Sequence, residues 1–170
     1  MLGVIGGSLG ASALNEITHR LASSSDRSFE ILHITGPTHE ELVGAQALGV
    51  EGWVVRGYEK DMPRLYAAVD LVLSRGGALT VAELHATRTA AVIVPLPAGG
   101  GYQGINAADV VGLGGAFVID QDHADEIVST VLSLLGDRGR LSEMRARLEN
   151  APHLTAAGRI ADRVLEVQGA

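Results

Sequence analysis

Apolar runs of strand length alternate with segments of helical periodicity along most of the chain, and this alternation limits the fold more than any other feature. Strands that alternate with helices form right-handed βαβ units, which build a parallel sheet with helices on both faces. The pattern predicts a Rossmann-like α/β fold with a parallel sheet of about six strands. The six runs lie at residues 2–6, 29–35, 52–57, 71–75, 91–97 and 115–120.

The central runs LVLS, at residues 71–74, and AVIV, at 91–94, are apolar without interruption. Continuous apolar runs are typical of strands buried on both sides. Towards the C-terminus the pattern becomes purely helical, with Pro152 dividing two segments. We expect a single domain over residues 1–170 with a helical tail from about residue 137 to residue 170.

Composition narrows the classes of protein to consider. A chain of 170 residues can bury one sizeable core. Its net charge of −7 and the lack of a Lys/Arg cluster disfavour binding to nucleic acid or to an anionic membrane surface. The absence of cysteine removes disulfides, thiolate zinc sites and thiol catalysis. Without a signal peptide or an apolar run of spanning length, the chain is expected to be cytoplasmic.

Ligands of open parallel sheets bind beyond the carboxyl ends of the strands, so the loops from strand to helix are the candidate binding segments. The first is Gly6-Gly7-Ser8-Leu9-Gly10. Glycines allow close backbone approach, and the following helix offers unpaired N–H groups, which suits a phosphate. Ser8 could instead only cap the helix. The loop is neither a GxGxxG fingerprint nor a P-loop.

The second loop, residues 74–84 (SRGGALTVAEL), places two more glycines before a helix. Two glycine-rich helix N-termini at one edge of a sheet could bracket a diphosphate. Glu83 could accept hydrogen bonds from the hydroxyls of a ribose. Alternatively, Thr80 to Glu83 fits the S/T-x-x-E capping box, in which the carboxylate only satisfies a backbone N–H.

The third loop, residues 95–109 (PLPAGGGYQGINAAD), leads into a helix that carries Gln103 and Asn106. A spacing of three puts both amides on one face of the helix. Amides donate and accept hydrogen bonds, which suits sugar hydroxyls. The alternative is that Asn106 is an ordinary helix residue with a satisfied amide.

Taken in order, the motifs GGSLGA, RGGALTVAEL and YQGINA resemble the C-terminal half of the MurG-type glycosyltransferases, with HITG and GYEKDMPRLYAAVDLVLSR between them. These bacterial enzymes transfer N-acetylglucosamine from its UDP donor to a lipid-linked muramoyl-pentapeptide in peptidoglycan synthesis. The resemblance implies the two-domain GT-B fold. This chain would be the C-terminal, donor-binding half, and the N-terminal acceptor domain would be absent.

The resemblance also implies a donor site built from the three loops and from the turn after the third strand. Glu83 would hold the ribose, Gln103 and Asn106 would contact the donor sugar, and the backbone near Tyr58 and Glu59 would read the uracil. The residues implied to meet the two phosphates are Gly7, Ser8, Leu9 and Gly10 in the first loop and Gly77, Ala78, Leu79 and Thr80 in the second.

The activity implied is an inverting transfer in which helix N-termini and neutral donors stabilise the diphosphate, without a metal or another cofactor. The catalytic residue is unknown here, because the base is expected on the missing half, and the isolated domain is expected to be inactive. The implied partners are UDP-N-acetylglucosamine and, through the missing half, the lipid-linked acceptor. The full-length enzyme would be peripheral on the cytoplasmic face of the membrane, with membrane contact only through that half.

Two other functions remain open: a stand-alone nucleotide-sugar-binding module without turnover, and a related glycosyltransferase with another acceptor. Gly100-Gly101-Tyr102 stands where many relatives have an acidic pair and a histidine, which leaves the selectivity for the donor sugar open. Asp120 and Asp122 imitate a metal-binding DxD motif, but a solvated helix cap is favoured. His85 is expected to be structural. Arg75 could pair with the diphosphate or with an acid.

Overall fold

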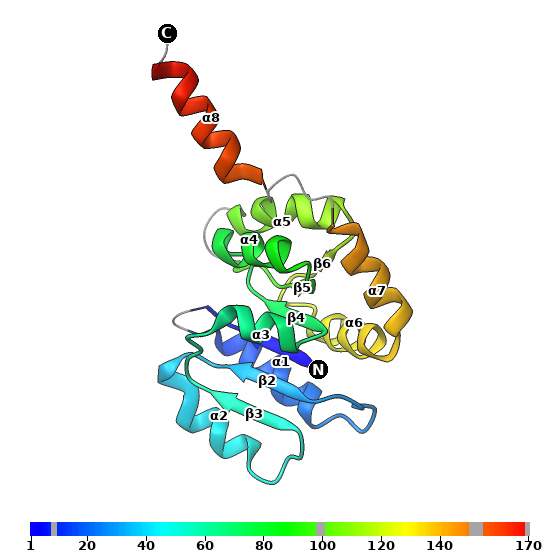
Figure 1. The fold of residues 1–170 in the computed structure, drawn as a ribbon. Coiled ribbons are helices and arrows are strands. Elements are labelled where there is room, and N and C mark those ends of the chain that lie inside the picture. The colour runs from blue at the N-terminus through cyan, green and yellow to red at the C-terminus, as the bar shows by residue number, and fades with distance from the viewer. Residues whose placement is uncertain (8–9, 98–100, 150–154, 169–170) are drawn as a thin grey trace.

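The predicted parallel sheet of six strands is confirmed by the computed structural model, which describes residues 1–7, 10–97, 101–149 and 155–168 (Figure 1). Every neighbouring pair of strands is parallel. The order across the sheet is β3-β2-β1-β4-β5-β6. The strands are β1 (Leu2–Ile5), β2 (Ile31–Ile34), β3 (Trp53–Arg56), β4 (Leu71–Ser74), β5 (Ala90–Ile93) and β6 (Ala116–Val118).

Helices connect the strands and cover the two faces of the sheet. One face carries α1 (Ser12–Ala22), α2 (Glu40–Ala47) and α6 (Ala124–Gly136). The other face carries α3 (Met62–Ala68), α4 (Ala78–Thr87) and α5 (Tyr102–Gly112). A short 3-10 helix, η1 (Pro37–His39), precedes α2.

The alternation of side chains along the central strands divides the core into two layers. Leu71 and Leu73 of β4 pack in the layer of α1 and α6, whereas Val72 packs in the layer of α3 and α4. Successive residues of a strand point to opposite faces, so a strand covered on both sides must be apolar at every position. This explains the uninterrupted runs in the sequence.

The edge strand β3 is covered on one face only. Trp53 is buried, but Val54 is 51% exposed and Arg56 is exposed as well. Helical cover on both faces therefore applies to the central strands and not to this edge.

The helical C-terminal part of the chain divides into two helices that differ in packing. Helix α7 (Arg138–Arg147) belongs to the body of the domain, because Leu141 and Met144 are buried in its core. Helix α8 (Ala156–Gln168) projects away from the body in Figure 1. Its exposed apolar side chains are Ile160, Val164, Leu165 and Val167. None of the helices in the described part of the chain is long and apolar enough to cross a membrane.

The sheet has its switch point between β1 and β4. From β1 the chain continues outward to β2 and β3, and from β4 it continues outward in the other direction to β5 and β6. The loops after β1 and β4 therefore separate and leave a crevice at the carboxyl edge, which is where ligands of such sheets bind.

Candidate functional site

A pocket of about 640 Å³ lies at the switch point. Three loops contribute to it, following β1, β4 and β5, together with the start of the connection after β6. Among the described residues, its lining contains one charged side chain, Arg75, and no carboxylate. The residues that line it are Gly6, Gly7, Gly10, Ala11, Ser12, Ala13, Arg75, Gly77, Thr80, Leu96, Gln103 and Gln121.

Backbone geometry explains the glycine at the end of the first loop. Gly10 has a φ of 76°, in the left-handed region, and a Cβ atom there would lie 1.9 Å from the carbonyl oxygen of Thr35. Only a glycine lets this loop pass so close to the end of β2. The cap position of α1 is Ala11, which provides no side-chain cap, and the first helical bond runs from Asn15 N–H to its carbonyl oxygen. Among the described residues, no side chain caps the N–H groups of the first turn, which are therefore available to a ligand.

The N-terminus of α4 repeats this arrangement across the crevice. Gly77 occupies the cap position without a side-chain cap, and Val81 N–H donates to its carbonyl oxygen. The helix itself therefore uses none of the N–H groups of Ala78, Leu79 and Thr80. Two helix N-termini with free donors and aligned dipoles favour an anion between them.

The capping box that the sequence allowed at Thr80 and Glu83 is wrong. Thr80 is the third residue of α4 and not its cap, because Gly77 occupies that position. Glu83 therefore has no N-terminal N–H to satisfy. Its Oε2 atom instead accepts a hydrogen bond of 2.8 Å from the hydroxyl of Tyr66 on α3.

The two amides of the third loop join it to the second loop. Gln103 Oε1 accepts hydrogen bonds from the N–H groups of Gly76, at 3.2 Å, and Leu96, at 2.9 Å. Asn106 Nδ2 donates to the carbonyl oxygen of Gly76 at 3.1 Å. Within the described residues, Gln103 Nε2 and Asn106 Oδ1 make no hydrogen bond. Each amide therefore braces the loops with one end and keeps the other for a ligand.

Arg75 is held by neutral oxygens and not by an acid. Its Nη1 atom donates to the carbonyl oxygens of Val94 and Pro95, both at 3.0 Å, and Nη2 donates to Gln121 Oε1 at 3.0 Å. Burial lowers the pKa of Arg75, yet an arginine stays protonated at neutral pH. No carboxylate of the described residues pairs with the guanidinium of Arg75. Its positive charge is therefore available to an anion in the pocket.

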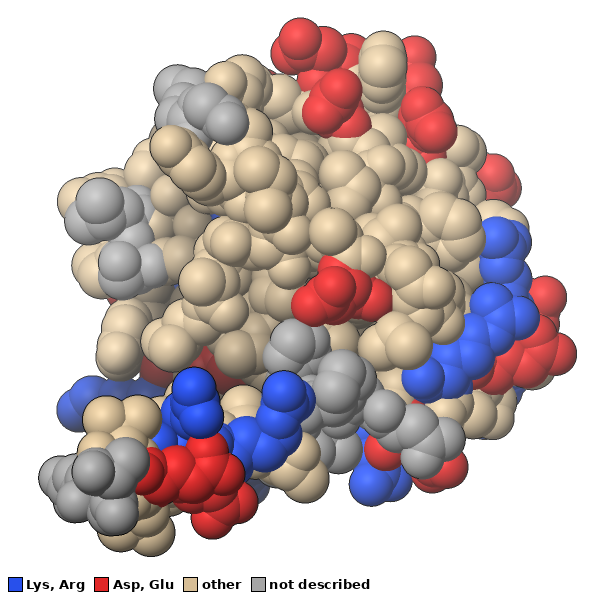
Figure 2. All heavy atoms as spheres, turned by 90° about the horizontal axis from the view of Figure 1, so that it is seen from above, with Lys and Arg blue, Asp and Glu red and all other residues tan. Residues whose placement is uncertain are grey.

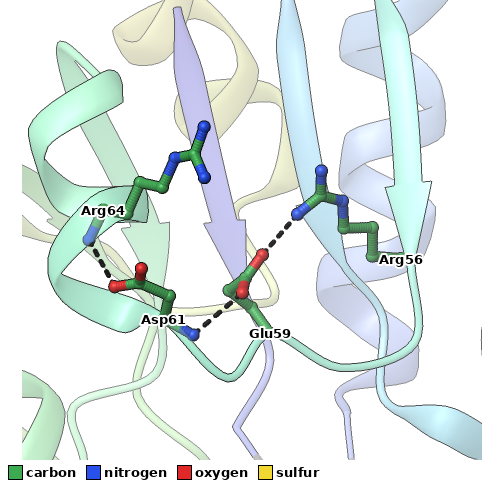
Figure 3. Close-up of polar contacts among 4 residues, drawn as sticks. All are labelled: Arg56, Glu59, Asp61 and Arg64. Atoms are coloured by element: carbon green, nitrogen blue, oxygen red, sulfur yellow. Dashed lines mark hydrogen bonds and ion pairs between the residues drawn. The ribbon is translucent and has the colours of Figure 1, made fainter.

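The turn after β3 is stiffened by its own acidic side chains (Figure 3). Glu59 accepts a hydrogen bond from the Asp61 N–H at 2.9 Å and pairs with the guanidinium of Arg56. Two contacts lower the pKa of Glu59. The hydrogen bond from the Asp61 N–H has the largest effect, and the hydrogen bond from Arg56 has the next largest. Asp61 caps α3 by accepting from the Arg64 N–H at 3.1 Å. Tyr58 lies in this turn with its side chain 60% exposed.

The predicted site residues divide into three sets. Gly7, Gly10, Gly77, Thr80 and Gln103 line the pocket directly. A second set is not among its lining residues. Ala78, Leu79, Glu83 and Asn106 lie on α4 and α5, the helices whose Thr80 and Gln103 line the pocket. Tyr58 and Glu59 lie in the turn after β3, where Glu59 lines a different pocket with Arg56 and Asp61. Ser8 and Leu9 lie outside the described residues.

Among the pocket residues that the sequence did not predict are two with polar side chains, Ser12 and Gln121. Ser12 begins α1, and its Oγ lies 3.3 Å from Nε2 of His39. Gln121 lies in the sequence between the two aspartates of the DxD-like segment, and both aspartates are exposed. These aspartates do not cap α6, because His123 holds the cap position without a side-chain cap.

In Figure 2 the molecule is seen from above the view of Figure 1, and most charged side chains lie near the edge of the visible face. Large exposed apolar residues occur on the α4–α5 side of the carboxyl edge. They are Leu79, Leu96, Tyr102 and Ile105. The α4–α5 side therefore combines an anion-accepting pocket with apolar surroundings.

The strand order and the two uncapped helix N-termini at the switch point are the features of Rossmann-like nucleotide-binding domains. Residues 1–161 match the family model described as the glycosyltransferase family 28 C-terminal domain. The chain therefore belongs to this family.

Relatives with curated names agree with this membership. The chain is 37% identical over 167 residues to the UDP-N-acetylglucosamine–N-acetylmuramyl-(pentapeptide) pyrophosphoryl-undecaprenol N-acetylglucosamine transferase of Rhodococcus erythropolis. It is 40% identical to the protein of the same name from Rhodococcus opacus. In each comparison 96% of the chain is covered, but only 43% and 44% of the relatives. The chain thus spans less than half the length of these proteins.

A solved structure supports the fold. The crystal structure of Acinetobacter baumannii MurG matches 97% of this chain with a TM-score of 0.86 and 28% identity. The match covers 49% of that MurG chain. The expected Rossmann-like fold and the resemblance to MurG-type glycosyltransferases are therefore confirmed.

Proposed function

We infer that the chain binds the donor UDP-N-acetylglucosamine at the switch point, as the donor half of a glycosyltransferase that forms a lipid-linked disaccharide for peptidoglycan. The observation that carries this proposal is the pocket itself. The N-termini of α1 and α4 converge there with Arg75, and no carboxylate of the described part of the chain lines it. This arrangement suits a diphosphate, and the relatives are named for a UDP-linked donor.

The nucleotide would lie across the carboxyl edge of the sheet. The diphosphate would accept hydrogen bonds from the first-turn N–H groups of α1 and α4. The uracil would meet the backbone of Tyr58 and Glu59, in a turn that its own hydrogen bonds already stiffen. Between them, the ribose would reach Glu83 on α4. The donor sugar would meet Gln103 Nε2 and Asn106 Oδ1.

The chemistry of the proposed transfer is displacement of UDP from the anomeric carbon by an acceptor hydroxyl. As that bond breaks, negative charge grows on the diphosphate. Fixed N–H donors and the Arg75 guanidinium stabilise this charge without reorganising, which lowers the barrier. The base that takes the acceptor proton, the acceptor site and any contact with the cytoplasmic face of the membrane would belong to a second half, outside this chain.

Titration calorimetry of the chain with UDP and with uridine tests the donor site. Because each charge-assisted bond to phosphate contributes about 1.5–3 kcal/mol, UDP is expected to bind at least about tenfold tighter than uridine. ADP and GDP should bind more weakly than UDP, since the turn after β3 reads the base. Equal affinity for UDP and uridine, or binding of neither, would contradict the proposal.

Turnover tests the division between the two halves. The chain alone is expected to transfer no sugar to a lipid-linked acceptor. When it replaces the corresponding half of the Rhodococcus opacus relative, the chimera should transfer N-acetylglucosamine. A chimera that binds UDP-N-acetylglucosamine but never turns over would point to a binding module instead.

A further inference from the structure

A buried tyrosine lies against the carboxylate proposed to hold the ribose. Tyr66 of α3 is only 3% exposed, and its hydroxyl donates to Glu83 Oε2 at 2.8 Å. Its ring packs in the core layer formed by α3, α4 and α5. The two residues are 17 positions apart in the sequence and are brought together by the packing of α3 against α4.

The hydrogen bond has a defined direction. Burial and the carboxylate of Glu83 both raise the pKa of Tyr66, so the phenol keeps its proton and acts as the donor. The carboxylate accepts through Oε2, while Oε1 makes no hydrogen bond with the described residues. One oxygen is therefore fixed by the protein, and the other is available to a ligand.

Glu83 also lies in the correct place for this role. It follows Thr80 by three residues, so the two share one side of α4, and Thr80 lines the pocket. Tyr66 belongs to α3, the helix that follows the turn of Tyr58 and Glu59. Glu83 is thus on the side of α4 that carries Thr80, and its carboxylate contacts the helix that follows the turn proposed to read the base.

We propose that Tyr66 is a positioning residue, which orients the Glu83 carboxylate so that its free oxygen accepts hydrogen bonds from the vicinal ribose hydroxyls. The inference rests on the proposed function, because it needs a ribonucleotide in the site. An unrestrained glutamate has three rotatable bonds and must lose that freedom when the ribose binds. The Tyr66 hydroxyl removes this cost beforehand, and the carboxylate remains an acceptor for the sugar.

A structural tie between α3 and α4 is the alternative role, and ribose analogues separate the two. We would measure dissociation constants of UDP and 2′,3′-dideoxy-UDP for the wild type, Tyr66→Phe, Glu83→Gln and the double variant, together with melting temperatures. A positioning role changes the preference for the ribose hydroxyls. A structural role lowers the melting temperature and weakens both nucleotides alike.

The wild type is expected to prefer UDP over the dideoxy analogue by about 10- to 100-fold, the range for hydrogen bonds to a charged group. Tyr66→Phe keeps the ring and should reduce this preference by about 3- to 10-fold, while the affinity for the analogue stays within about twofold. In the Glu83→Gln background, Tyr66→Phe should change the preference no further, because Tyr66 acts through the carboxylate.

Thr87→Val is the matched control. The Thr87 hydroxyl also donates to Glu83 at 2.8 Å, but to its backbone carbonyl oxygen. Removing this bond should leave the preference unchanged. If Tyr66→Phe does not fold, Tyr66→Met, with a smaller and more flexible apolar side chain that lacks a hydroxyl, is measured in the same way.

The outcomes distinguish this inference from the proposed function. If the wild type prefers UDP and Tyr66→Phe keeps the whole preference, or Thr87→Val loses as much of it, the positioning role is wrong and the donor site stands. If the wild type binds neither nucleotide, both fail together. A preference that falls in Tyr66→Phe and Glu83→Gln alone supports the inference.

Discussion

The carboxamide of Gln103 divides its two ends between the protein and the proposed ligand. Its oxygen is used by the Gly76 and Leu96 N–H groups, whereas its nitrogen is left for a sugar hydroxyl. Replacement by alanine would therefore disturb the loops and the ligand contact together. A variant that keeps the oxygen and loses the nitrogen donor separates the two roles.

Gln103→Glu is that variant. It keeps an acceptor for both N–H groups, so the melting temperature should change little, but it has no N–H to offer the sugar. The advantage of UDP-N-acetylglucosamine over UDP should fall about tenfold, as expected for one lost hydrogen bond to a ligand. The new negative charge acts on the diphosphate of both ligands, so the ratio of their dissociation constants isolates the sugar contact.

Gln103→Met is the control, because it leaves two backbone donors unpaired and should lower the free energy of unfolding by about 1–3 kcal/mol. A sugar hydroxyl can also donate to the carboxylate of Gln103→Glu, so both variants are compared. If Gln103→Glu and Gln103→Met both retain the full advantage of the sugar nucleotide, Gln103 only braces the loops.

His33 makes the stability of the fold depend on pH. It is fully buried in β2, its ring stacks on Trp53, and its Nε2 lies 3.0 Å from Asn15 Oδ1. Burial lowers the pKa of His33 from 6.5 to about 4. The unfolded chain therefore binds a proton below about pH 6.5 while the folded chain stays neutral, and folding loses free energy as the pH falls towards 4.

The difference of about 2.5 pKa units at 1.36 kcal/mol each gives a loss of about 3 kcal/mol between pH 7 and pH 4. Urea unfolding across this range measures it. His33→Phe can still stack on Trp53 and removes the titrating group, so its curve should be flatter than that of the wild type by this amount. Parallel curves for the two proteins would show that another group is responsible.

At the scale of elements, the contact between the first loop and the end of β2 decides the shape of the phosphate site. Gly10→Ala would place a methyl group against the Thr35 carbonyl oxygen and strain a left-handed φ. The two effects together should lower the free energy of unfolding by about 2–4 kcal/mol and weaken UDP binding. Chemical denaturation and calorimetry measure the two quantities.

Gly49→Ala is the matched control, because Gly49 has a φ of 78° but no atom within 4 Å of the new methyl group. It should lose only the strain of the backbone, about 1 kcal/mol, and leave UDP affinity unchanged. Equal losses in the two variants would mean that the contact with Thr35 is easily relieved.

Elements could be predicted well where one local property decides them. Strand β4 is buried on both faces, and the length and continuity of its apolar run predict this directly. The capping box was wrong because Gly77, three residues before Thr80, is the cap of α4. Nothing in the local spacing of Thr80 and Glu83 distinguishes a cap from the first turn of a helix.

For the whole molecule, the preference for right-handed crossovers limits the possible orders of the strands, but contacts between distant segments do not follow from any local pattern. The bond between Tyr66 and Glu83, and the brace between Gln103 and Gly76, join residues on separate elements. They depend on how α3, α4 and α5 pack side by side, which periodicity cannot define. The three loops could therefore be predicted to form a site, whereas the assignment of each amide end could not.

The brace around Gly76 has a consequence for the kinetics of ligand entry. Its N–H and carbonyl oxygen are both bonded to α5 side chains, and a Cβ at this position would lie 2.4 Å from the Gln103 carbonyl oxygen. The second loop and the start of α5 are thereby joined at Gly76. A nucleotide that reaches Gly76 and Gln103 meets two segments that are already bonded to each other, so its association there is expected to be limited by diffusion and orientation and not by bringing these two segments together.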